Sequence, residues 1–365
     1  MEKKERNISI DILRILSMLA IVILHAQSKT EILSSYGAGK SGWLSHWGLQ
    51  SLCYVAVNCY VLISGYFLSN ENTKFNIKKI LNIWFAVEFW SIVLFVMSSI
   101  YIGEFSFHSF LIALFPVTFR EYWFVTVYIA LYILAPYINK LINNLDKKQY
   151  KKLLLTVLIL FSIWPTLTPY SGEDGVIGIN GIGGTNLIWF MTVYIIAGYI
   201  RKFYDPEINK PIKYLIGYIV SIVIMLIFQA AMSVVDIMFG SGGNYGTWMM
   251  NYASIVNIFA SVMIFTFFVC CKLKVPNNVK KIILFLSKGT FGVYLIHEHP
   301  LVRPILWNPV KNSNVSSFVG LKYLVCILTI AISVFIVCCI LENIRLWIFN
   351  NVKNVCTRSR KYSMR

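Results

Sequence analysis

Ten apolar runs, most of them about as long as a bilayer is thick, divide this 365-residue chain. A crossing helix needs about 20 apolar residues, and backbone in lipid must satisfy its own hydrogen bonds, so each run is expected to be helical. The runs at 186–201 and 282–301 depart most from this pattern, because the first is short and the second contains Lys288. The ten predicted spans are 8–28, 48–68, 80–102, 122–144, 152–170, 186–201, 213–238, 251–271, 282–301 and 320–345.

The composition excludes an ordinary soluble protein. Hydrophobic residues make up 57% of the chain and charged residues 13%, whereas soluble domains average about 25% charged residues. The sequence therefore predicts an all-α polytopic membrane protein, with a single transmembrane domain at 1–350 and a basic cytoplasmic tail at 351–365. Asp11 and Arg14 interrupt the first apolar run, and no small-residue cleavage site follows, which favours an uncleaved span over a signal peptide.

The positions of lysine and arginine predict the topology. With the N-terminus inside, 24 of the 33 basic residues fall in inner segments, six in outer segments and three within spans. This bias is typical of cytoplasmic loops and places both termini in the cytoplasm. The net charge of +17 is thereby explained by topology and by contact with anionic membrane lipid. No basic stripe interleaved with aromatic residues is present, so no nucleic-acid partner is expected.

Cysteine and glycine patterns give no sign of a metal or phosphate site. The eight cysteines form no C-x-x-C pair and lie mostly in apolar runs, where they are expected to act as small hydrophobic residues. No zinc-ligand spacing is present, so no metal is predicted. The glycine-rich outer loops at 172–184 and 240–248 lack the Gly-Lys-Ser/Thr of a phosphate loop. They are interpreted as flexible turns or as a rim that binds an acceptor.

Two ionisable residues inside the first span form the strongest functional signal. Arg14 and His25 are eleven residues apart, so they share one helix face about 16 Å apart along the axis. Ionisable residues within a membrane mark functional sites by default. Arg14 requires an anionic partner, which is either Asp11 one turn earlier or a group of the substrate. His25 lies near the outer surface and is the natural general base.

Four stretches together resemble the acyltransferase-3 family of bacterial membrane O-acyltransferases, over residues 1 to about 350. The first is Asp11-x-x-Arg14-x10-His25 in the first span. The others are an apolar Ser-Gly-aromatic segment, the aromatic start of a middle span, and a segment of the ninth span. They are Val61–Phe67 with Ser64 and Gly65, Glu121–Phe124 with Trp123, and Phe291–His297 with Tyr294.

The resemblance implies acyl transfer from acyl-CoA, usually acetyl-CoA, to a hydroxyl of a cell-surface glycan. Arg14 would steady the donor, and His25 would act as general base or form a covalent acyl intermediate. Lysines in the loop after the Ser-Gly segment would meet the nucleotide phosphates, although topology alone also explains them. They are Lys74, Lys78 and Lys79.

The remaining motif residues have supporting roles in this interpretation. Ser64 and Gly65 are expected to allow close helix contact, because the Gly-x-Ser-x-Gly of a nucleophilic serine is missing. Trp123, Tyr294 and His297 would line the site or lie at the membrane interface.

The sequence leaves two other classes of function open. A transporter or flippase for a lipid-linked glycan also carries buried charges, although internal helix repeats are limited here to a short Trp-Phe echo. A membrane module without catalytic activity would tolerate the loss of Arg14 or His25. The preferred prediction is a multi-pass O-acetyltransferase of the bacterial plasma membrane that uses acetyl-CoA, needs no metal and has a glycan acceptor. The oligomeric state stays open.

Overall fold

The computed structural model describes residues 7–37, 39–69, 75–167, 184–206, 210–239, 245–271 and 273–363. Regular structure in these ranges consists of helices alone. The α-helices are α1 Ile8–Lys29, α2 Trp43–Cys53, α3 Ala56–Leu68, α4 Ile77–Ile102, α5 Phe107–Leu114, α6 Trp123–Asn143, α7 Lys147–Leu158, α8 Trp164–Leu167, α9 Leu187–Phe203, α10 Ile212–Phe239, α11 Ile255–Cys270, α12 Asn277–His297, α13 Val302–Lys311 and α14 Gly320–Ser363.

Eight helical segments among the described residues are long and apolar enough to cross a membrane. Three of them join consecutive elements, as when α2 and α3 together form the span Trp43–Leu68. The two predicted spans that fall outside this set are the two that depart from the sequence pattern. Helix α9 has 17 residues, and α12 carries three lysines. The eight apolar segments, and regular structure made of helices alone in the described residues, confirm the predicted all-α polytopic fold. Helix α9 packs against α3 and α6, and α12 packs against α1 and α14.

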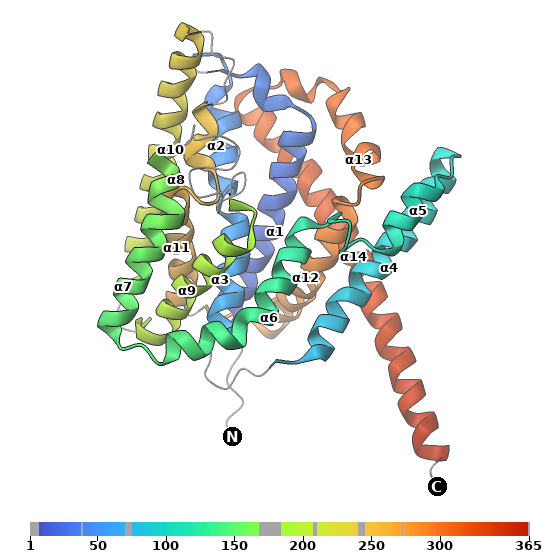
Figure 1. Ribbon diagram of the computed structural model, residues 1–365. Coiled ribbons are helices and arrows are strands. Elements are labelled where there is room, and N and C mark those ends of the chain that lie inside the picture. The colour runs from blue at the N-terminus through green and yellow to red at the C-terminus, as the bar shows by residue number, and fades with distance from the viewer. Residues whose placement is uncertain are drawn as a thin grey trace.

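Helix α1 lies in the middle of the bundle, in contact with α3, α12 and α14 (Figure 1). It begins at Asn7, whose side chain accepts a hydrogen bond from the Ser9 backbone N–H. Helix α1 begins and α14 ends at the same end of the bundle, which we call the lower end, and α1 ends at the upper end (Figure 1). Helix α1 therefore carries Arg14 near the lower end and His25 near the upper end.

Glycine allows close helix contacts in the bundle. A Cβ atom added to Gly65 would lie 2.8 Å from the Ala197 Cβ and 3.1 Å from the Tyr194 Cα. Helices α3 and α9 therefore approach too closely for a larger residue, which is the role expected of Gly65. Gly292 allows the same kind of approach between α12 and α14, because an added Cβ would lie 2.3 Å from the Glu342 Cβ.

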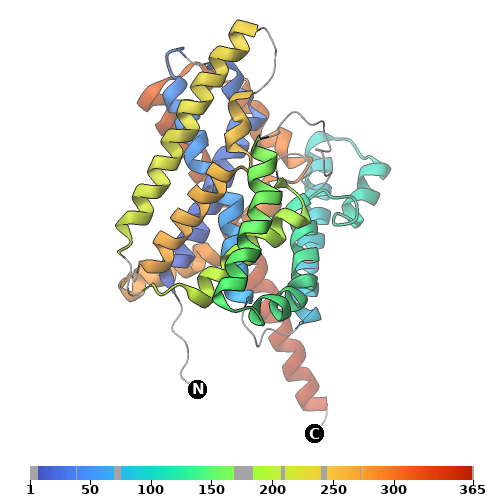
Figure 2. The same ribbon diagram turned by 60° about the vertical axis from the view of Figure 1, so that its left-hand side comes forward.

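Helix α14 extends beyond the rest of the bundle. The second half of α14 runs beyond the lower end of the bundle in both views (Figures 1 and 2). The predicted tail is therefore a continuation of α14 as far as Ser363. Lys74, residues 172–183 of the first glycine-rich loop and residues 240–244 of the second lie outside the described residues.

Candidate active site

His25 lines a cavity of about 180 Å³ in the upper half of the bundle. The walls come from α1, α3, α6 and α12, together with the ends of α2 and the segment before α11. The exposed Ser28 lies at one end of the lining, and Met18, near the middle of α1, lies toward the other. The cavity therefore follows about three turns of α1, from the upper rim toward the centre of the membrane.

Two side chains from the end of α12 hold the imidazole of His25. Its Nδ1 lies 2.9 Å from His297 Nε2 and 3.2 Å from Glu298 Oε1. His297 is buried, and its own Nδ1 lies 2.5 Å from the backbone oxygen of Val293 one turn earlier. Because Glu298 caps α12 directly after His297, one helix end supplies both contacts to His25.

These contacts assign the protons of the two imidazoles. A carbonyl oxygen can only accept, so His297 Nδ1 donates to Val293, and the neutral ring has its lone pair on Nε2. His25 Nδ1–H then donates to His297 Nε2, and Glu298 Oε1 lies 3.2 Å from the same nitrogen without accepting a hydrogen bond from any residue that the structure describes. The lone pair of His25 is thereby placed on Nε2. A neutral imidazole in this state can accept a proton at Nε2, as a general base must.

Charged groups surround the upper end of α12. Arg303, on α13, places its Nη1 3.9 Å from Glu298 Oε2, the oxygen that does not contact His25. Glu121 lies near the same guanidinium. Burial raises the pKa of the Glu121 carboxyl, and the charge of Arg303 opposes that rise. The positive charge of Arg303 therefore offsets the negative charges of Glu298 and Glu121 at this end of α12.

Arg14 is anchored at the lower half of α1 by a single nitrogen. Its Nη1 donates to Asp11 Oδ1 at 2.9 Å and to Ser287 Oγ on α12 at 3.3 Å, and Ser287 also donates to Asp11 Oδ1 at 2.8 Å. The expected pairing of Asp11 with Arg14 is thus present. Both contacts use Nη1, and the Arg14 side chain is 27% exposed. Among the described residues, no hydrogen bond from Nε or Nη2 is recorded, so these groups can take a further anionic or polar partner.

Tyr60 connects the two halves of the site. It lines the cavity, and its hydroxyl donates at 2.9 Å to the backbone oxygen of Arg14. Tyr60 therefore links the cavity wall to the turn of α1 that carries Arg14, although Arg14 itself is not among the cavity's lining residues. An extended molecule lying along this face of α1 would pass from Arg14 to His25.

Polar aromatic residues form the wall near His25. Trp123 and Tyr252 stack with ring centroids 6.5 Å apart, and Tyr54 lies 5.1 Å from Tyr252. All three residues line the cavity, as does Tyr294. Gln50 also lines it, and its Oε1 atom accepts no hydrogen bond from any residue that the structure describes. The wall therefore offers flat rings and an amide to a bound molecule.

The predicted site residues separate into two groups. His25, Trp123 and Tyr294 meet in the cavity, and His297 supports His25 from behind. Ser64 and Gly65 lie outside the cavity lining: Ser64 is within hydrogen-bonding reach of Tyr128, and Gly65 faces α9.

The predicted phosphate-binding lysines lie at the lower end of α4. Lys78 is exposed in the first turn, and the Lys79 Nζ lies 4.7 Å from the ring centroid of Tyr132 on α6. Lys79 therefore lies beside Tyr132, and Tyr132 and Arg14 both lie near Tyr128.

Sequence reasoning missed Glu298 and Gln50. Glu298 stands in the run His297-Glu298-His299, where three titratable residues follow one another at the end of a predicted span. That unusual density was the available signal. Gln50 carries no comparable signal, because a single glutamine in an apolar segment has many structural roles.

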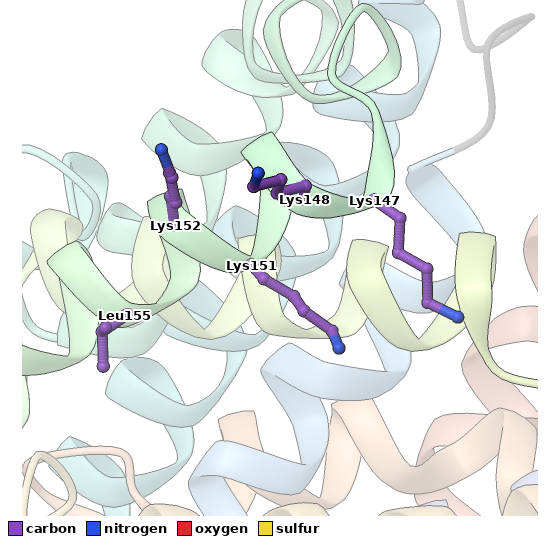
Figure 3. A pocket seen from close by; sticks show the side chains of 5 residues that line it. All are labelled: Lys147, Lys148, Lys151, Lys152 and Leu155. Atoms are coloured by element: carbon purple, nitrogen blue, oxygen red, sulfur yellow. The ribbon is translucent and has the colours of Figure 1, made fainter.

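A second pocket, at the start of α7, has a different chemistry. Four lysines extend from the first turns of this helix, as Figure 3 shows. They are Lys147, Lys148, Lys151 and Lys152, with Leu155 beside them. The charge of this pocket agrees with the predicted concentration of lysine in cytoplasmic segments.

Comparison with known proteins gives one match. A family model described as an acyltransferase domain, that of the acyltransferase-3 family, matches residues 7–342. No curated protein and no solved structure matches the chain. The matched range begins just before α1 and ends within α14, so it includes every residue of the cavity and of its supports.

Proposed function

The chain belongs to the acyltransferase-3 family and is a membrane acyltransferase; on this premise we propose that it moves an acetyl group from cytosolic acetyl-CoA to a hydroxyl of a glycan outside the cytoplasm or linked to lipid. The observation that carries the proposal is the fixed imidazole of His25, which lines a cavity while His297 and Glu298 hold its Nδ1.

The proposed reaction is a direct transfer. The acceptor hydroxyl oxygen attacks the thioester carbonyl carbon while His25 Nε2 takes the hydroxyl proton. The carbon–sulfur bond then breaks, the ester is released, and the coenzyme A thiolate takes the proton from the imidazolium. His297 Nε2 and the Glu298 carboxylate stabilise the imidazolium through Nδ1–H. A positioned base of this kind contributes about 10²–10⁴-fold to the rate.

The donor is proposed to enter from the lower end of the bundle. Coenzyme A is cytosolic, and the predicted topology makes the lower end cytoplasmic. Its phosphates would meet Lys78 and Lys79, with Lys74 in the preceding segment, and Arg14 would bind a polar group of the pantetheine arm through Nε or Nη2. The proposed order is supported by the neighbouring positions of Lys79 and Tyr132, and of Tyr132 and Arg14 around Tyr128.

The acceptor is proposed to enter from the upper end. The flat rings of Tyr54, Trp123 and Tyr252 suit the apolar face of a sugar, and the Gln50 amide can pair with a sugar hydroxyl. These groups lie on the same cavity as His25, so a sugar stacked there would present a hydroxyl to its imidazole. The location proposed for this reaction is the bacterial plasma membrane.

The test is a transfer assay with full-length protein in liposomes, labelled acetyl-CoA and a lipid-linked glycan. We expect label on the glycan with the native chain and a loss of at least about 10²-fold in H25Q. The matched control is H299Q, because His299 is also buried at the end of α12 but faces the Ser91 backbone oxygen.

Three outcomes would contradict the proposal. They are equal activity in H25Q, glycan that crosses the bilayer without gaining label, and an equal loss of activity in H299Q at unchanged folding. Label retained on the protein after acid quenching, and absent from H25Q, would assign the covalent acyl-imidazole route in place of the direct one.

A further inference from the structure

Three metal-binding atoms converge beside the cavity. One ligand atom each of His25, His297 and Glu298 lies within 4.8 Å of the other two. Two imidazoles and one carboxylate are a donor set that zinc uses where a fourth position stays open to solvent or substrate. Because His25 lines the cavity, a metal held here would have its open position close to that space.

The spacing of these atoms suits zinc. With Zn–N bonds of 2.0–2.1 Å and tetrahedral angles, donor atoms lie about 3.3 Å apart. The His25 Nδ1 atom is 2.9 Å from His297 Nε2 and 3.2 Å from Glu298 Oε1. A shift of a few tenths of an ångström in the His25 ring is therefore enough for these two pairs of donors.

Neighbouring groups already orient the donors as metal ligands require. The second ring nitrogen of a histidine ligand usually donates to a carbonyl or carboxylate, which fixes the lone pair on the metal side. His297 Nδ1 makes this contact with Val293, 2.5 Å away. Arg303 contacts Glu298 through Oε2, so Oε1 is the oxygen that faces the histidines.

We propose that His25, His297 and Glu298 form a zinc site, and that zinc bound there switches off His25 as a base. To bind zinc, His25 must offer the Nδ1 lone pair, so its ring proton moves from Nδ1 to Nε2. The nitrogen that accepted the hydroxyl proton is then itself protonated. Zinc binding and acyl transfer are therefore mutually exclusive at this histidine.

The site is set for reversible rather than permanent binding. Arg303 and Lys29 are close enough to act electrostatically on His25, and their positive charges oppose a divalent cation. Three protein ligands also bind zinc less tightly than the four of a closed structural site. A chelator is therefore expected to remove the metal and restore activity without unfolding the chain.

The first experiment measures binding and does not depend on enzyme activity. Full-length, tag-free protein in lipid nanodiscs is titrated with Zn²⁺ against a chromogenic competitor, with H297Q, E298Q and H299Q in parallel. We expect the native chain and H299Q to bind about one zinc per chain. H297Q is expected to bind none, and E298Q is expected to bind zinc at least about 10-fold more weakly than the native chain. Mg²⁺ is expected not to compete, because it prefers oxygen ligands.

Equal zinc binding by the native chain and H297Q would overturn the site, and so would its loss in H299Q. Thermal unfolding of each variant separates a lost ligand from a misfolded chain. E298Q keeps the site testable if H297Q unfolds, because equal zinc affinity in E298Q would also count against it.

The second experiment concerns the switch and rests on the proposed function. Zinc is expected to inhibit acyl transfer by the native chain over the concentration range in which it binds, and EDTA is expected to reverse the inhibition. Zinc that binds through these residues without inhibiting an active enzyme would overturn the switch. A native chain that transfers no acyl group would overturn the proposed function, whereas the zinc site would still stand or fall by the binding data.

Discussion

The two ends of the polar face of α1 are built alike but supported differently. At each end one nitrogen of the functional side chain makes the contacts that hold it. This nitrogen is Nη1 in Arg14 and Nδ1 in His25. The support of Arg14 comes from Asp11 on its own helix and from Ser287 on α12. The two side chains that contact His25 Nδ1, His297 and Glu298, both come from the C-terminal end of α12.

This difference reflects two different requirements: Arg14 needs a counter-charge, whereas His25 must be held in one orientation. A guanidinium in the membrane needs a nearby negative charge, and a carboxylate one turn away on the same helix supplies it wherever that helix packs. A general base must present one particular nitrogen, which requires a partner at a fixed position in space. At the upper end that position is set by how α12 packs against α1.

The largest expected effect comes from breaking the upper support while keeping its shape. E298Q removes the negative charge that stabilises the His25 imidazolium, so kcat is expected to fall about 10²-fold or more, with little change in the KM for acetyl-CoA. Steady-state kinetics in liposomes measure both constants. E298D is the conservative control and should recover part of kcat.

A change of KM without a change of kcat in E298Q would show that Glu298 binds substrate instead of positioning His25. Equal thermal stability of E298Q and the native chain is needed for this conclusion. Since Arg303 loses its partner in E298Q, R303Q in the same assay shows how much of the effect comes from that pair.

The second prediction tests whether Arg14, at the lower end, binds the donor or only pairs with Asp11. R14Q removes the groups proposed to hold the donor, so the KM for acetyl-CoA is expected to rise about 10–100-fold, the value of a charged hydrogen bond. D11N keeps Arg14 but removes its counter-charge, and is expected to lower the unfolding temperature more than it changes KM. Matching effects of R14Q and D11N on both quantities would make Arg14 part of a purely structural pair.

Contacts within one helix could be predicted from the sequence, whereas contacts between helices could not. The pairing of Asp11 with Arg14 follows from a spacing of three residues, and the shared face of Arg14 and His25 follows from helical geometry. Eight of the ten predicted spans coincide with helical segments long and apolar enough to cross a membrane among the described residues. The other two correspond to α9 and α12, whose shortness and lysines mark them already in the sequence. Local rules were sufficient for these features.

The support of His25 could not be predicted in this way. His297 is 272 residues away in sequence, and its contact depends on the position of α12 beside α1. The close packing of α12 on α14 at Gly292 helps to fix that position. No periodicity in either helix reports which turn of one will face which turn of the other, so Glu298 and Gln50 become visible only in the folded chain.

A smaller effect is expected at the acceptor wall. Q50M replaces the Gln50 amide with a side chain of similar length that cannot pair with a sugar hydroxyl. One neutral hydrogen bond contributes about 1 kcal/mol, so the KM for the glycan is expected to rise about 5-fold while the KM for acetyl-CoA stays unchanged. A rise in the acetyl-CoA KM instead would move Gln50 to the donor side of the cavity.

The smallest effect is expected at the lower surface, where charge is solvated. K78Q removes an exposed cation in the first turn of α4, and an exposed interaction of this kind contributes up to about 1 kcal/mol. The acetyl-CoA KM is therefore expected to rise about 2–4-fold at low salt, and the difference should shrink as salt screens the charge. K148Q, from the lysine pocket on α7 (Figure 3), is the control for general surface charge. An equal rise in both variants would mean that the lower end attracts coenzyme A through its overall field, with no defined place for the phosphates beside α4.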